Sequence, residues 1–166
     1  MIKEKDVVFV GTKGICLVES IKKNPFAGCE KTKEYYVLKP FSSNTNMVVF
    51  LPVDTKIKIR PLISKTKAQS FLNKITEFKF SDEEAQLEAS KNYVDALKDV
   101  DFERRLKILN YLMSRKKTIS KKLFSVQEQK VLNSIVDCVV DELSCVLGLD
   151  KSSVQETVLS QFEENE

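Results

Sequence analysis

This chain lacks histidine, one of the residue types that many hydrolytic enzymes need for nucleophilic catalysis. Its 166 residues include no His and no Trp. A Ser-His or Cys-His catalytic pair therefore cannot form. The four cysteines, Cys16, Cys29, Cys138 and Cys145, form no CxxC pair, so a zinc site is not expected either. We accordingly expect no enzyme activity, no small-molecule substrate, no cofactor and no metal.

A short glycine motif, Gly11-Thr12-Lys13-Gly14, could in principle hold a phosphate, because glycines let backbone amides approach an anion. A phosphate loop, however, needs a longer spacing that ends in Gly-Lys-Ser/Thr at the start of a helix. Here the second glycine opens a run typical of a strand. We therefore interpret the motif as a hairpin turn.

The most promising chemical feature is a local basic stretch at residues 101–123, which holds 8 Lys/Arg and 2 Asp/Glu. Both neighbouring segments are acidic, so the basic charge is confined to this stretch. A local basic face suggests an anionic partner such as DNA. A solvated lysine-rich surface is the alternative, since cations also favour helix C-termini. The DNA-binding candidates are Arg104, Arg105, Arg115, Lys116, Lys117, Lys121 and Lys122.

Hydrophobic periodicity changes near residue 65 and predicts two different parts of the chain. The first part has short runs rich in Val, Ile, Tyr and Phe, separated by turn residues, which favour a small antiparallel β-barrel. The expected strands are 7–10, 14–21, 34–41, 47–53 and 57–60. We place this β-barrel domain at 1–65, a linker with a short helix at 66–80, and a helical bundle at 81–166. The predicted fold class is α+β.

Helix start signals are visible throughout the second part. Capping-box patterns occur at Ser81-x-x-Glu84, Ser125-x-x-Glu128 and Ser153-x-x-Glu156, and Asp101 can cap another helix. Gly148 is suited to end the long apolar helix predicted for 126–147. The wide apolar stripe of that helix predicts a central position in the bundle.

The order and spacing of several runs resemble a known family. KDVVFVGTKGICLVESI, EYYVLKP, FLPVD and IKIRPLI resemble the RNA-polymerase-interacting module of CarD-type bacterial transcription regulators, which also occurs in transcription-repair coupling factor. A KDVD junction at 98–101, a basic helix and the run LFSVQEQKVLNSIVDCVVDEL resemble the helical domain of CarD proteins.

The resemblance implies a Tudor-like barrel that docks on the RNA polymerase β subunit, and helices that engage promoter DNA near the upstream edge of the bubble. The docking edge corresponds to Met47–Pro52 with the Asn24-Pro25-Phe26 loop beside it. An exposed strand edge can add to a partner's sheet, which agrees with such docking. The implied polymerase-binding residues are Asn24, Phe26, Val48, Phe50, Leu51 and Pro52.

Two departures from the CarD pattern affect these expectations. CarD proteins commonly carry a tryptophan early in the helical domain that wedges at the junction of duplex and melted DNA. About Gln86 stands at that position here, among acidic residues. In CarD proteins, basic residues commonly help the barrel contact polymerase. The corresponding positions here are approximately Asn24 and Phe50, so docking should be more apolar.

The sequence thus predicts a bacterial transcription regulator that binds polymerase through its barrel and modulates promoter open-complex stability through a DNA-facing helical domain. The alternative is a polymerase-binding adaptor with little or no DNA contact. The apolar runs are too short to span a bilayer, so we expect no membrane association and a cytoplasmic, nucleoid-associated protein.

Overall fold

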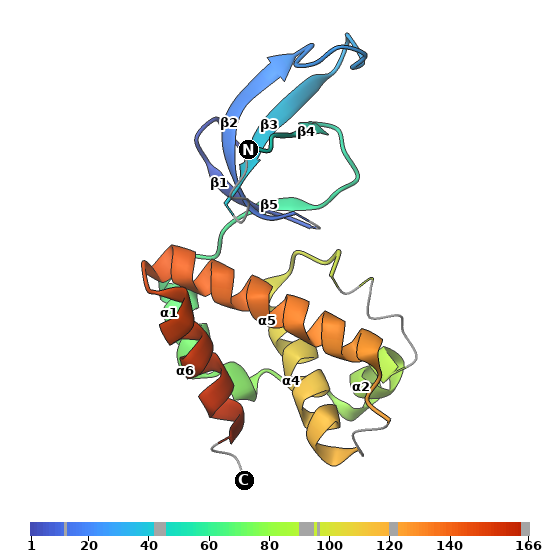
Figure 1. The fold of residues 1–166 in the computed structure, drawn as a ribbon, viewed down its shortest axis with the longest axis vertical. Coiled ribbons are helices and arrows are strands. Elements are labelled where there is room, and N and C mark those ends of the chain that lie inside the picture. Colours follow the sequence, from blue (N-terminus) through green and yellow to red (C-terminus); the bar gives the residue numbers. More distant parts are fainter. Residues whose placement is uncertain (12, 42–45, 90–94, 96, 120–122, 164–166) are drawn as a thin grey trace. The chain divides into compact units, whose positions relative to one another are not determined.

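The computed structural model describes residues 1–11, 13–41, 46–89, 95, 97–119 and 123–163. The chain divides into two compact units, Met1–Leu62 and Ile63–Glu166 (Figure 1). Segment 66–80, predicted as a linker with a short helix, contributes Ala68, Leu72 and Ile75 to the hydrophobic core of the second unit.

The first unit is an antiparallel sheet of five strands: β1 (Val7–Val10), β2 (Gly14–Lys23), β3 (Glu34–Pro40), β4 (Val49–Pro52) and β5 (Ile59–Pro61). Their order in the sheet is β4-β3-β2-β1-β5 (Figure 1). With the helices that follow, the predicted α+β class is confirmed. Among the described residues β4 and β5 do not pair, so the sheet is open and is a barrel only in a loose sense. The hairpin interpretation of Gly11 to Gly14 is also confirmed, because Val10 pairs with Gly14, whose φ of 73° is a conformation that glycine adopts without strain.

Alternation along the strands separates a core face from an outer face. Tyr36 pairs with Leu51 on the core face, whereas Val37 pairs with Phe50 on the outer face. A register shift between Val18 and Ser20 marks a β-bulge in β2. The core residues of this unit are Val8, Val10, Cys16, Val18, Tyr36, Leu38 and Leu51.

The second unit contains α1 (Lys65–Asn73), η1 (Ile75–Glu77), α2 (Asp82–Ala89), α4 (Phe102–Thr118), α5 (Val126–Leu147) and α6 (Lys151–Glu163). The bounds of α5 match the prediction for 126–147. Its capping box is present, with Ser125 Oγ accepting from the Glu128 N–H and Glu128 Oε2 accepting from the Ser125 N–H. Asp101 caps α4, and Gly148 ends α5 at a φ of 67°.

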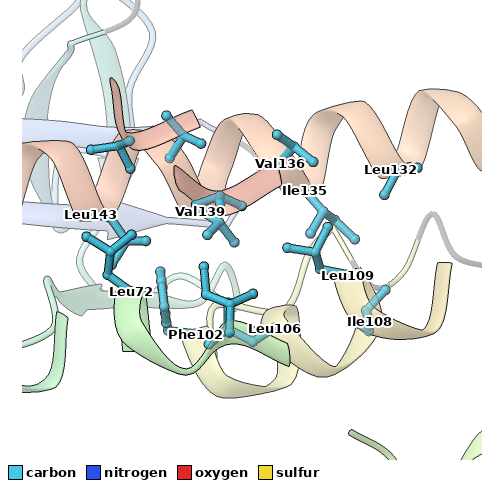
Figure 2. Close-up of a cluster of buried hydrophobic side chains, with 14 of the residues drawn as sticks. Leu72, Phe102, Leu106, Ile108, Leu109, Leu132, Ile135, Val136, Val139 and Leu143 are labelled. Carbon is cyan, nitrogen blue, oxygen red and sulfur yellow. The ribbon is translucent and has the colours of Figure 1, made fainter. Parts of the chain in front are cut away.

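The long helix α5 is central in this unit, as its apolar stripe predicted, because α1, α4 and α6 all contact it. Figure 2 shows how Leu72 of α1, Phe102 and Leu106 of α4, and Val139 and Leu143 of α5 converge on one cluster. These side chains are at most 8% exposed, so their burial dominates the stability of the bundle.

The prediction that Ser153 begins the last helix is wrong. Helix α6 starts at Lys151, and Asp150 caps it by accepting from the Ser153 N–H (3.1 Å). Asp and Ser are equally good cap residues, so the local pattern could not choose between them.

Candidate functional site

Strand β4 forms one edge of the sheet in the first unit (Figure 1). The Val53 N–H donates to the Glu34 carbonyl oxygen (2.9 Å), and Leu51 lies opposite Tyr36. Because hydrogen-bonding pairs alternate along an antiparallel ladder, the main-chain N–H and C=O of Phe50 point away from β3. The edge therefore presents main-chain hydrogen-bonding groups next to an aromatic side chain.

Aromatic rings gather on the outer face of this edge. The Phe26 ring lies 5.0 Å from the Phe50 ring and 5.7 Å from the Tyr35 ring, measured between centroids. Tyr35 pairs with Pro52, so both belong to the same face. We call Phe26, Tyr35, Phe50 and Pro52 the aromatic edge surface. Phe26 and Phe50 are 42% and 37% exposed, although both are large apolar side chains.

The loop between β2 and β3 brings Phe26 onto this surface. Asn24 begins the turn with a φ of 53°, a left-handed conformation that Asn adopts more readily than most residues. The Cys29 N–H donates to the Phe26 carbonyl oxygen (3.4 Å), and the Glu30 N–H donates to the Tyr35 hydroxyl (3.1 Å). These contacts fold the loop back over β3, which places the Phe26 ring between Tyr35 and Phe50.

An ion-pair network borders the loop. Lys33 Nζ lies 3.0 Å from a Glu30 carboxylate oxygen and 3.2 Å from one of Asp54. Hydrogen bonds to Glu30 and Asp54 raise the pKa of the Lys33 ammonium. The network connects the β2–β3 loop with the segment after β4.

The predicted polymerase-binding residues do not all share this surface. Phe26, Phe50 and Pro52 do, and Val48, two residues before Phe50, is 38% exposed. Asn24 is exposed in the loop. Leu51 is only 5% exposed and lies in the core, because alternation turns it to the opposite face from Phe50.

Sequence reasoning missed Tyr35, which is 6% exposed and contacts the Phe26 ring edge to face. Its position on the outer face follows from the pairing of Tyr35 with Pro52. The adjacent Tyr35 and Tyr36 carry no alternation that would reveal this face, so only the register could identify it.

The basic candidates at the start of α4 are used within the second unit. Arg105 is 2% exposed and donates to the Asp99 carbonyl oxygen (2.5 Å). Arg104 Nε lies 3.4 Å from an Asp99 carboxylate oxygen. Arg105 thus stabilises the entry to α4 from inside the bundle, where a phosphate could not reach it.

At the end of α4 the cations differ in their contacts. Arg115 Nε donates to Glu128 Oε1 at 2.7 Å and so links α4 to the first turn of α5. Lys117 donates to the carbonyl oxygen of Phe162 in α6. Lys116 is exposed on the same turn. Lys121 and Lys122 lie outside the described residues.

The described residues contain no group of three or more His, Cys, Asp or Glu that could hold a metal ion. Within the same described ranges, none of the helices is long and apolar enough to cross a membrane. Cys16 is fully buried, and burial raises the pKa of its thiol to about 11 despite the nearby charge of Lys13. That thiol is therefore a packing group.

A small antiparallel sheet with an exposed apolar edge can pair with a strand of a partner protein. Residues 2–63 match the family model of the CarD-like/TRCF RID domain, and this range nearly coincides with the first unit. RID denotes an RNA-polymerase-interacting domain, so the first unit is a CarD-like module of this type and gives the protein an RNA-polymerase-interacting role in transcription. The recognition made from the sequence runs is confirmed for this unit. No curated protein matches the chain.

Proposed function

We propose that this protein is a non-enzymatic bacterial transcription regulator that docks on the β subunit of RNA polymerase through the aromatic edge surface. The contact of Phe26 with Phe50 on an edge strand carries the proposal. An edge strand can pair with a strand of a partner through main-chain hydrogen bonds, while the aromatic side chains select the partner. Such a factor would act in the cytoplasm, at the nucleoid.

The chemistry of the surface indicates how this docking would respond to salt. Its members are apolar or aromatic, and Lys33 beside it is already paired with Glu30 and Asp54. Apolar burial is insensitive to ionic strength, whereas exposed ion pairs are screened. We therefore expect binding to the β subunit to change little between low and high salt.

A binding experiment with the full chain and a purified bacterial β subunit tests the docking. We expect a saturable complex in both low and high salt. Absence of binding in either buffer would overturn the proposal. Binding that disappears at high salt would show that charges, and not the aromatic edge surface, carry the contact.

The helical unit admits two roles, a promoter-DNA contact that modulates open-complex stability or a polymerase adaptor with little DNA contact. DNA binding by phosphate contacts needs several available cations on one face. Arg105 is buried, and Arg115 is paired with Glu128. These interactions favour the adaptor role, while exposed Lys116, with Lys121 and Lys122 following in sequence, keeps the DNA role as a second candidate.

Charge reversal separates the two roles. Replacing Lys116, Lys121 and Lys122 with Glu removes basic side chains without touching the Arg115 and Lys117 contacts. If the helical unit faces DNA, the variant should shorten the open-complex lifetime and flatten its salt dependence, because fewer counterions are released. If the protein is an adaptor, the lifetime should match that of a Lys130→Glu control, which changes an exposed lysine of α5. Binding to the β subunit should be retained in both variants.

A further inference from the structure

A cavity of about 380 Å³ lies within the helical unit, in the range of small-molecule sites. Its walls come from η1, from the segment before α2, from α2 itself, from α4 and from the end of α6. None of these elements belongs to the first unit, so the cavity is separate from the aromatic edge surface.

Three aromatic side chains line the cavity: Phe80, Tyr111 and Phe162. Phe80 and Tyr111 pack edge to face with ring centroids 6.4 Å apart. Rings from three different segments therefore line one cavity, and stacking of a nucleobase on one aromatic ring contributes about 1–3 kcal/mol. The apolar part of the cavity is therefore suited to a planar ring system.

Positive charge is concentrated around the same cavity. Lys79 and Lys117 both line it, and no acidic residue is among the described residues that do. Lys117 is held in place by its hydrogen bond to the Phe162 carbonyl oxygen. A third cation, Lys107, lies 5.9 Å from the centre of the Phe80 ring, although Glu84 neutralises it at 3.8 Å. The two lining lysines favour an anionic group on the ligand.

Asn110 is a buried polar residue among those that line the cavity. It is 7% exposed, and its amide nitrogen donates to the carbonyl oxygens of Ile75 (2.7 Å) and Leu106 (2.9 Å). Both amide hydrogens are thereby used, and the orientation of the side chain is fixed. What this side chain can offer a ligand is its Oδ1 acceptor, which requires a donor such as an amino group on the ring.

We propose that this cavity binds a small planar heteroaromatic anion of the mononucleotide type, with its ring among Phe80, Tyr111 and Phe162 and its anionic group at Lys79 and Lys117. The combination of aromatic walls, two cations and the buried amide of Asn110 carries the assignment. The site would make the helical unit responsive to a small metabolite while the first unit holds polymerase.

Titration of the isotope-labelled full chain with AMP, followed by NMR at the backbone amides of Asn110, Tyr111 and Ser114, tests the proposal. We expect saturable shifts at these amides. Ribose 5-phosphate keeps the anionic group but lacks the ring. Because it loses the stacking contribution, its affinity should be at least about tenfold lower than that of AMP. Binding to the β subunit, measured in parallel, should not change with AMP-site substitutions.

The matched variants are Lys79→Glu, at the cavity, and Lys130→Glu, on an exposed part of α5 away from the lining residues. Lys79 is exposed and lies between η1 and α2, so its reversal should leave the unit folded. We expect Lys79→Glu to weaken AMP binding at least about threefold, because the substitution replaces an attraction between exposed charges with a repulsion. Lys130→Glu should bind AMP like the wild type.

Three results would overturn the proposal. These are an absence of saturable shifts at AMP concentrations up to about 10 mM, equal binding of AMP and ribose 5-phosphate, or equal effects of the two lysine reversals. None of them bears on polymerase docking, which depends on the other unit.

Discussion

Replacement of Phe50 by Glu tests the aromatic edge surface most directly. Phe50 is 37% exposed, its ring contacts Phe26, and its main-chain groups point outward from the sheet edge. The substitution places a charge at the centre of the proposed apolar contact and leaves the core residue Leu51 untouched. We expect the variant to remain folded, because Phe50 lies on the outer face.

The size of the effect follows from the exposed area. A Phe side chain presents about 200 Å² when fully exposed, so docking on Phe50 would remove about 75 Å² from water. At about 25 cal/mol per Å², this burial contributes about 2 kcal/mol, or about 25-fold in affinity. A carboxylate trapped in the same contact adds a desolvation cost, so Phe50→Glu should weaken binding by about 100-fold or more.

Affinity of the full chain for the purified β subunit, measured by calorimetry or biolayer interferometry, provides the assay, with circular dichroism to confirm folding. Ile57→Glu is the matched control, since Ile57 is 44% exposed in the same unit but leads into β5 at the opposite edge. It should bind within about threefold of the wild type. A folded Phe50→Glu variant with the affinity of the control would refute docking through this surface.

Three further measurements concern the stability and reactivity of the two units. Burial acts to raise the pKa of the Glu128 carboxyl, but hydrogen bonds from the Ser125 N–H and from Arg115 outweigh it and hold the pKa below its ordinary value of 4.5. The stabilisation by this carboxylate is therefore present above pH 4.5 and lost as pH falls through the lowered pKa. Glu128→Gln should lower the free energy of unfolding in urea by about 1–2 kcal/mol at neutral pH, and the stability of the variant should depend less on pH in the acid range. Asn110→Ala removes the buried hydrogen bond to the Ile75 carbonyl oxygen, which then keeps only the 3.3 Å bond from the Phe78 N–H, and should cost about 1 kcal/mol in the same assay. An unchanged midpoint would contradict the contact. Cys16, fully buried with a thiol pKa of about 11, should resist a thiol reagent at pH 8 until the first unit unfolds, whereas exposed Cys145 should react in the native state.

Local sequence signals determined the bounds of β1 and α5. The Ser125–Glu128 capping box and Gly148 define both ends of α5 because their hydrogen bonds and backbone conformations involve only a few neighbouring residues. Strand β1 and its turn to β2 were predictable for the same reason. The apolar stripe of α5 also sufficed to predict its central position, and the structure shows that α1, α4 and α6 contact it.

Only the tertiary structure decided which side chains are available to a partner. Phe50 and Leu51 are adjacent and both apolar, and their opposite exposure depends on the pairing of β4 with β3. Arg105 is as basic as its neighbours, yet the packing of α4 places it inside the bundle. Closure of the sheet likewise depends on whether β4 and β5 meet. Register, helix rotation and strand closure are set by contacts between segments far apart in the chain, and a local pattern carries no information about them.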